Sequence, residues 1–219
     1  MKFASLYDMS LHNVNVLINL PEETDSDIIE AIDNLKYLRF FLHPVNFKHY
    51  LLSVHVSSSS RYYSKVKEES DFWTTSSIAH EFLKEYINKT NQWDIFSFMK
   101  PTRHYLWDTF RRIEKFYLDN KHTYSIVKNN KTFNFREYVN GRKIIDFDMK
   151  ETSLYTLILN HCNNKVITLS EIVSKIGLLK EKFTNEKIIT TIDELYKKGL
   201  LYRSSDYSEI ISVINLETT

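Results

Sequence analysis

Residues 13–42 read NVNVLINLPEETDSDIIEAIDNLKYLRFFL, and this stretch decides the predicted fold. Residues 14–20 form a short, β-branched apolar run, which predicts a buried strand. A polar turn follows at Pro21, and a helix is expected to begin near Thr24 or Asp25, whose side chains can cap free backbone amides. This strand–turn–helix order is typical of the units that build parallel βα barrels.

The helix predicted after this turn has one apolar face, which is formed by Ile28, Ile32, Leu35, Leu38 and Leu42. Pro44 blocks its continuation, and residues 50–57 predict a second strand. Residues 1–66 are therefore predicted to be a βαβ remnant of a barrel, because they are too few to close eight strands.

Residues 67–150 are predicted to form a helical segment followed by a β meander. Helical periodicity extends over residues 67–118, and short β segments follow over residues 124–148. Asn129-Asn130 and Asn140-Gly141 are expected at the turns, because asparagine and glycine tolerate a positive φ.

Residues 151–219 are predicted to form a separate, winged-helix-like module. Thr168 and Glu171 form a capping box, and Gly177 and Gly199 are expected to end the second and third helices. The expected elements are helices at residues 152–162, from residue 168 and at about residues 184–198, and a hairpin of residues 200–203 and 209–213. The whole chain is thus predicted to be α+β: a partial βα barrel remnant, a helical segment with a β meander, and this module.

The composition narrows the classes of function. The chain has 219 residues, a formal net charge of +1, one cysteine and three glycines. A charge near zero gives no global attraction to nucleic acid or membrane, and so few glycines argue against P-loop and dinucleotide sites. One cysteine excludes a disulfide within the chain, and the N-terminal residues lack the apolar core of a secretory signal. No stretch approaches the roughly 18 apolar residues of a membrane span, so we expect a cytoplasmic protein.

Three blocks of the sequence resemble the C-terminal half of radical S-adenosylmethionine proteins, in particular peptide-maturase-like members, which are often cobalamin-associated. The first block is the turn NLPEET, and the last is the winged-helix-like tail after the β meander. Between them lie LRFFL at 38–42, FKH at 47–49 and SRYY at 60–63. The tail is similar to the small modules that bind leader peptides in such systems.

The chain departs from this family in two respects. The three-cysteine motif that holds the iron–sulfur cluster is absent, and two glycines of the family's turn correspond here to Asn19 and Glu22. The resemblance therefore implies a degenerate cofactor-binding turn at Asn19, Pro21, Glu22 and Glu23, and no catalytic residue on this chain. An iron–sulfur cluster and S-adenosylmethionine would require a partner chain. A split subunit, a decayed fragment and a repurposed relative all fit this pattern.

Two local patterns have alternative interpretations. Glu22 and Glu23 could act as an acid–base pair, or they could lie at a helix N-terminus, where the helix dipole favours carboxylates. We favour the second interpretation. His43, His49 and His55 lack the spacing and the neighbouring ligands of a metal site, so no metal is predicted.

The third helix of the tail offers a surface for either DNA or peptide. Residues 151–219 contain eight Lys/Arg and nine Asp/Glu, a formal charge of −1, whereas DNA-binding surfaces are typically basic. Peptide binding fits this charge better than DNA binding does. A module that only stabilises the rest of the chain by packing is an equally good interpretation. The outer positions of the helix are Asn185, Lys187, Thr190, Thr191, Glu194 and Lys197. The candidate peptide-binding residues are Thr190, Glu194, Tyr202 and Tyr207.

The sequence therefore predicts a non-catalytic fragment or accessory subunit, related to radical S-adenosylmethionine peptide-maturation enzymes, that binds a peptide or a catalytic partner protein. The chain would contribute to catalysis only as one subunit of a split enzyme of the radical S-adenosylmethionine type. The alternative is a winged-helix regulator that binds DNA.

Overall fold

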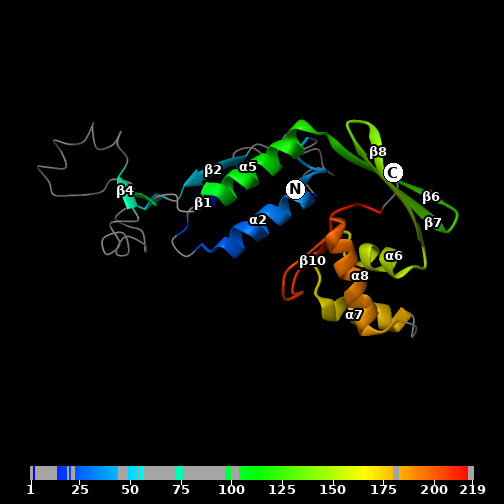
Figure 1. The fold of residues 1–219 in the computed structure, drawn as a ribbon. Coiled ribbons are helices and arrows are strands. Elements are labelled where there is room, and N and C mark those ends of the chain that lie inside the picture. Colours follow the sequence, from blue (N-terminus) through cyan, green and yellow to red (C-terminus); the bar gives the residue numbers. More distant parts are fainter. Residues whose placement is uncertain are drawn as a thin grey trace, which may run out of the picture. The chain divides into compact units, whose positions relative to one another are not determined.

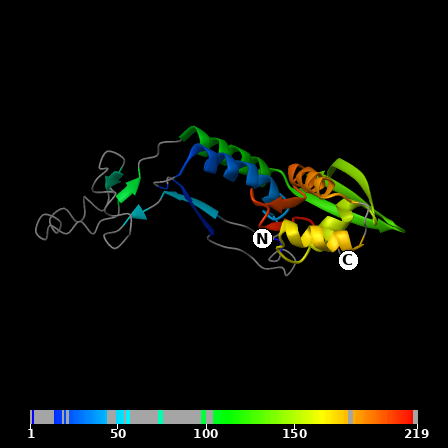
Figure 2. The same cartoon turned by 90° about the horizontal axis from the view of Figure 1, so that it is seen from below.

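The structure is a computed structural model, and it shows a mixed α+β chain (Figures 1 and 2). Its described residues contain no helix that is both long and apolar enough to cross a membrane. Contacts divide the chain into two compact units. Unit 1 holds residues 1–11, 33–47 and 113–219, and unit 2 holds residues 12–32 and 48–112. The described residues are 2, 14–18, 20, 23–43, 49–53, 55–56, 73–75, 97–99, 104–179 and 183–216.

Unit 2 begins with the predicted strand–helix–strand order. Strand β1 (Val14–Ile18) pairs in parallel with β2 (His49–Ser53), and Leu17 lies opposite Leu52. Helix α2 (Asp25–Leu38) connects them, because a parallel pair requires a crossover rather than a tight turn. Both strands are shorter than predicted.

A reciprocal cap explains why α2 begins where it does. The Thr24 backbone N–H donates to Asp27 Oδ2 over 2.7 Å, and the Asp27 N–H donates to Thr24 Oγ1 over 3.3 Å. Two amides at the start of the helix are thereby satisfied. The predicted start is confirmed, and Ile28 and Leu35 on the predicted apolar face are buried.

The helical prediction for residues 67–118 is wrong at two places. Strands β4 (Trp73–Thr75) and β5 (Ser97–Met99) lie there, and β5 pairs antiparallel with both β4 and β3 (His55–Val56). Aromatic and β-branched residues favour strands, and pairing with a distant segment outweighs helical periodicity in such short runs. Helix α5 (His104–Asp119) confirms the last part of the prediction. The apolar stripe at residues 78–87 lies outside the described residues.

The β meander of unit 1 is present as predicted. Strands β6 (His122–Asn129), β7 (Thr132–Val139) and β8 (Arg142–Lys150) form an antiparallel sheet in that order. Asn130, Asn140 and Gly141 have positive φ values at the two turns, as the turn chemistry requires. Central strand β7 alternates, so that Phe133, Phe135 and Glu137 face inward.

Three helices and a hairpin follow the meander in unit 1. Thr168 and Glu171 cap α7 reciprocally, as predicted, and Ser153 and Thr184 cap α6 and α8. Gly199, with φ of +66°, ends the last helix as predicted. Gly177 was expected to end α7 but lies inside it, because glycine tolerates helical backbone at a modest cost. The elements are α6 (Leu154–His161), α7 (Leu169–Leu179), α8 (Asn185–Lys197), β9 (Leu201–Arg203) and β10 (Ile210–Ser212).

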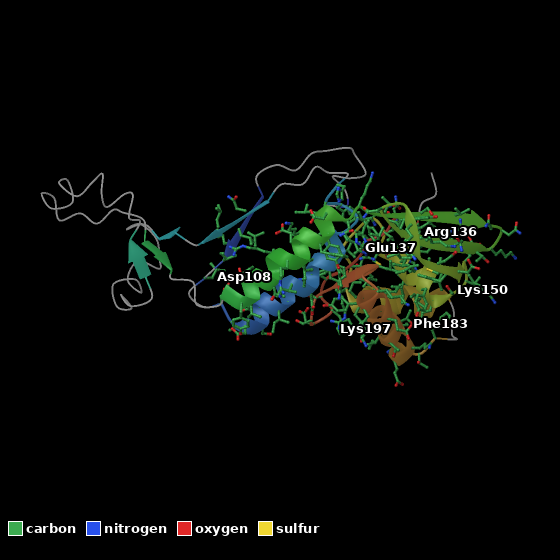
Figure 3. The ribbon with its side chains drawn as sticks, turned by 45° about the horizontal axis from the view of Figure 1, so that its top comes forward. Asp108, Arg136, Glu137, Lys150, Phe183 and Lys197 are labelled. Atoms are coloured by element: carbon green, nitrogen blue, oxygen red, sulfur yellow. The ribbon has the colours of Figure 1, made fainter. Side chains whose placement is uncertain are left out.

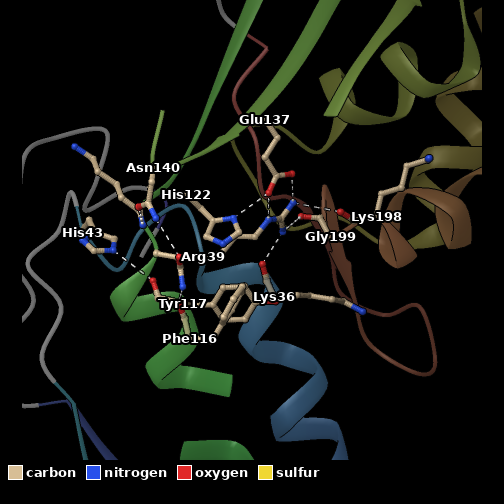
Figure 4. A network of polar contacts seen from close by, with 12 residues as sticks. Lys36, Arg39, His43, Phe116, Tyr117, His122, Glu137, Asn140, Lys198 and Gly199 are labelled. Carbon is tan, nitrogen blue, oxygen red and sulfur yellow. Dashed lines mark hydrogen bonds and ion pairs between the residues drawn. The ribbon is translucent and has the colours of Figure 1, made fainter. Parts of the chain in front are cut away.

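A buried ion pair joins the end of α2 to this core (Figure 4). Arg39 binds Glu137 through two parallel hydrogen bonds, Nε to Oε1 at 2.8 Å and Nη2 to Oε2 at 3.0 Å. Its remaining N–H groups donate to the carbonyl oxygens of Lys36, Lys198 and Gly199. The five donors of the guanidinium group therefore all have acceptors, as a buried arginine requires.

His122 lies on the other side of the same carboxylate. Its Nδ1 is 3.1 Å from Glu137 Oε1, and its ring packs edge-on against Phe116 and Tyr117. Its Nε2 is buried and has no partner among the described residues. Glu137 thus serves as acceptor for both a guanidinium and an imidazole.

Arg39→Met is expected to destabilise unit 1 by about 3 to 5 kcal/mol, because it leaves the Glu137 carboxylate buried without its cation. Arg39→Met/Glu137→Met should lose much less than the sum of the two single changes, since it removes both charges. Urea unfolding of the three variants measures this coupling. Additive losses would contradict it.

Gly199→Ala is expected to cost more than Gly141→Ala, although both glycines have a positive φ. A Cβ at Gly199 would lie 2.5 Å from Arg39 Nη1, whereas a Cβ at Gly141 meets nothing within 4 Å. Gly141→Ala should therefore cost only the backbone strain of about 1 to 2 kcal/mol, and Gly199→Ala about 1 kcal/mol more, through the displaced arginine. Equal losses of unfolding free energy would contradict this.

Candidate functional site

The residues predicted for a degenerate cofactor turn lie largely outside the described part of the chain. Of the four, Asn19, Pro21 and Glu22 are not described. The Glu23 carboxylate accepts a hydrogen bond from Trp107 Nε1 at 3.2 Å, so within unit 2 it holds the start of α5. Among the described residues, no three His, Cys, Asp or Glu side chains come together as metal ligands.

The four candidate peptide-binding residues have different surroundings. Thr190 and Glu194 lie one turn apart on the exposed side of α8. Tyr202 packs edge-on against Tyr37, with ring centroids 5.6 Å apart, and Tyr207 donates a hydrogen bond to Asp193 at 2.9 Å. The two tyrosines therefore take part in packing between secondary-structure elements rather than presenting a free surface.

Two cations pack against tyrosine rings in the same region. Lys36 Nζ is 4.4 Å and the Arg203 guanidinium carbon is 4.5 Å from the centroid of the Tyr196 ring. Arg203 also covers the Tyr207 ring and pairs with Asp193 at 2.7 Å. Burial lowers the pKa of Lys36. This alternation of cations and rings ties α2, α8 and the hairpin together.

A cavity of about 340 Å³ lies elsewhere in unit 1, beside the end of β8. Figure 3 marks Lys150 and Lys197, which are the last residues of β8 and α8. The cavity is lined by Phe147, Asp148, Met149, Lys150, Ser153, Tyr155 and Lys198. The end of a strand, the start of α6 and the residue after α8 thus enclose one hollow, which we call the β8 cavity.

The β8 cavity lies along the edge of the strand. Successive strand residues point to opposite faces of a sheet, so a hollow that touches four of them in a row meets both faces. β8 pairs with β7 on one side, and no strand in the described part of the chain pairs with its other side. The Lys150 carbonyl at the end of the strand accepts hydrogen bonds from the Ser153 N–H and the Thr156 hydroxyl, at 2.8 and 2.9 Å. The outward N–H and C=O groups before it are therefore the ones available to a further strand.

The walls of the cavity combine apolar rings with unpaired lysines. Phe147 packs on Phe135 at a centroid distance of 5.2 Å, and Lys198 Nζ lies 5.6 Å from the Phe147 centroid. Lys150 and Lys198 are exposed, and within the described residues neither ammonium pairs with a carboxylate. Asp148 accepts a hydrogen bond from Asn134 Nδ2 at 2.7 Å.

One predicted residue, Glu194, binds a side chain of the cavity wall without lining the cavity itself. The Tyr155 hydroxyl donates to Glu194 Oε2, which ties the start of α6 to α8. Burial, together with this hydrogen bond, raises the pKa of Tyr155 to about 12. Glu194 is therefore attached to the cavity wall through Tyr155, but none of the four candidate peptide-binding residues lines the cavity.

Sequence reasoning missed most of the β8 cavity, including Phe147, Lys150 and Lys198. A usable local signal was the position of residues 147–150 in the last strand of the meander, where an edge is expected. The hollow itself depends on how α6 and the end of α8 meet that strand, which no local pattern encodes.

Comparisons of the chain with protein-family models, curated proteins and solved structures found no match. The resemblance to radical S-adenosylmethionine proteins therefore stays a prediction. Function has to be argued from the geometry of the site.

Cys162 is expected to resist iodoacetamide at pH 8 in the folded protein and to react once urea unfolds it. Its Sγ is fully buried and donates to the Ile158 carbonyl, and burial raises the pKa of the thiol to about 12. The thiolate that would react is thus suppressed in the folded state. Because the folded pKa lies above the ordinary 9.0, this thiol's contribution to stability is lost as pH rises from about 9 to about 12. Mass spectrometry measures the modification, and rapid native alkylation would contradict the prediction.

Proposed function

We propose that this chain is an accessory protein related to radical S-adenosylmethionine peptide-maturation enzymes, and that it binds an extended peptide at the β8 cavity. The observation that carries the proposal is a hollow that follows four successive residues of β8, whose outer edge pairs with no strand among the described residues. A peptide that adds to such an edge gains main-chain hydrogen bonds, and one of its side chains fills the hollow.

We further propose that residues 151–219 have a winged-helix-like arrangement. Helices α6, α7 and α8 are followed by the β9–β10 hairpin, and an isolated antiparallel bridge joins Ile167 to Ile210. This bridge connects the segment between the first two helices to the hairpin, which supports the arrangement. The preceding meander then supplies the edge on which the peptide lies.

The exposed side chains of β8 support an extended ligand. Ile144 and Ile145 are 50% and 37% exposed, and they lie in the middle of a strand whose outer side pairs with no other strand in the described part of the chain. Ile144 is the extra residue of a β-bulge beside Ile145, because the register shifts between Glu137 and Tyr138. Neighbouring apolar side chains that face solvent are typical of a surface that another segment covers. The ligand would therefore lie along residues 144–150.

The charges of the cavity suggest the chemistry of the ligand. The exposed ammonium groups of Lys150 and Lys198 flank an apolar wall of Phe147 and Met149, and Asp148 is engaged with Asn134. An apolar side chain next to an aspartate or glutamate would match this arrangement. We propose a peptide of that pattern.

The same features favour peptide over DNA. The exposed side of α8 carries Lys187 and Lys197, but Glu186 and Glu194 lie among them. Phosphate contacts supply most of the affinity for DNA, so carboxylates on the helix that would enter the groove oppose binding. The edge strand and its cavity, by contrast, would have no role in binding a DNA duplex.

Catalysis is assigned to a partner chain in this proposal. A cluster needs several thiolates, and the single thiol of this chain, Cys162, is buried. If the purified chain, reconstituted anaerobically with iron and sulfide, formed a stoichiometric cluster and cleaved S-adenosylmethionine, the proposal of a non-catalytic protein would be wrong.

Selection from a phage-displayed library of random linear peptides tests the binding site. Enriched peptides should carry an apolar residue beside an acidic one, and they should bind Lys150→Glu/Lys198→Glu about tenfold or more weakly than the unaltered chain. Lys187→Glu/Lys197→Glu is the matched control, because it makes the same change of charge on the outer side of α8 and should leave peptide affinity unchanged. Fluorescence anisotropy measures the dissociation constants.

Two results would contradict the proposal. Peptides that bind both double variants equally well would remove the β8 cavity as the site. Salt-dependent binding of a DNA duplex that the Lys187→Glu/Lys197→Glu variant loses would favour the DNA-binding alternative.

A further inference from the structure

The ammonium group of Lys2 lies in a cage of oxygen atoms within unit 1. Its Nζ is 2.5 Å from the carbonyl oxygen and 2.9 Å from the side-chain oxygen of Asn163. It is also 3.1 Å from the carbonyl oxygen of Ser212 and 3.0 Å from that of Ile214. Lys2 is 8% exposed, and the three residues that supply the oxygens are at most 3% exposed. One buried cation thus joins the end of α6 to the segment after β10.

All four oxygens belong to uncharged groups, three backbone carbonyls and one carboxamide. Carbonyl dipoles arranged around a cation replace its hydration shell, as in the selectivity filters of potassium channels. Ammonium and potassium ions have closely similar radii, and both are bound by oxygen atoms. A cage that holds a primary ammonium group at hydrogen-bond distance therefore suits a free ion of either kind.

The cage is held in shape by bonds that do not involve Lys2. Asn163 Nδ2 donates to Asn215 Oδ1 at 2.8 Å, which aims the Asn163 side-chain oxygen. The Ser212 N–H donates to the Cys162 carbonyl at 2.9 Å, and the Ser212 hydroxyl donates to the Ile214 carbonyl at 2.6 Å. The Asn215 N–H donates to the Tyr124 hydroxyl oxygen at 3.0 Å. These contacts keep the oxygens together when the ammonium group is removed, and buried oxygens without a partner are costly.

We propose that these oxygens form a binding site for a monovalent cation, that Lys2 fills it as a tethered ammonium, and that a potassium or ammonium ion takes its place when the Lys2 charge is absent. Removing or neutralising Lys2 then makes unit 1 dependent on the cation in the buffer. This site is separate from the β8 cavity, and none of its residues lines that cavity.

Thermal unfolding of Lys2→Ala in different chloride salts of equal ionic strength tests the proposal. Choline is too large for the cage and serves as the reference cation. Lys2→Ala should unfold at a lower temperature than the unaltered chain in choline chloride. Potassium or ammonium chloride should raise the midpoint of Lys2→Ala in a saturable manner, as mass action requires for one site. The unaltered chain and the control Lys165→Ala, which removes an exposed lysine, should show no such dependence.

The separate potassium, ammonium and sodium series show which ion the cage accepts. An equal effect of all salts, including choline, would overturn the proposal. So would an unchanged midpoint of Lys2→Ala in choline chloride, or failure of this variant to fold in both potassium and ammonium chloride.

A chemical substitution at the same position gives an independent measurement. In Lys2→Cys, aminoethylation of the new thiol restores an ammonium group of nearly the same length, while the buried Cys162 thiol stays protected in the folded protein. The aminoethylated protein should recover the original midpoint and lose its response to potassium. The protein treated with methyl methanethiosulfonate, which adds a neutral group, should keep that response. Equal recovery by the neutral adduct would overturn the proposal.

Discussion

Arg39 reaches from the end of α2 to Glu137 in β7, 98 residues further along the chain, and also binds the carbonyl oxygens of Lys198 and Gly199. Both charges are almost completely buried, so each needs the other to offset the loss of water. The guanidinium also fixes the chain immediately after α8. Lys198 forms one wall of the β8 cavity, so the same arginine that joins α2 to the sheet sets the shape of the proposed peptide site.

Local chemistry made parts of this fold predictable. The caps at Thr24 and Thr168 and the turn at Asn140-Gly141 depend on residues within three positions of one another, and they occur as predicted. Gly177 shows the limit of such rules, because a glycine ends a helix only where the following chain departs from it. The strands at residues 73–75 and 97–99 show the same limit, since each depends on a partner far away in the sequence.

The buried ion pair between Arg39 and Glu137 could not be predicted from the sequence for a different reason. Glu137 follows Phe133 and Phe135 at a spacing of two, so the strand pattern places it on the inner face. A charge at an inner position demands a counter-charge, but nothing in the local sequence says that it comes from Arg39. His122 was overlooked as well, because a single histidine at the start of a strand carries no motif. Sequence periodicity does not encode which charges pair over long distances in the chain. The β8 cavity depends on such a pair.

The buried cations of Arg39 and Lys2 make the C-terminal helices dependent on the N-terminal part of the chain. Arg39 and Lys2 come from the N-terminal fifth of the chain, yet they bind backbone carbonyls at Asn163, Lys198, Gly199, Ser212 and Ile214. A fragment of residues 151–219 would leave these oxygens without their donors, and it would also lack Phe147 and Lys150 of the cavity wall. The proposed binding at the edge of β8 therefore has to be tested on the chain of 219 residues, because Arg39 and Lys2 also organise the module to which the peptide is proposed to bind.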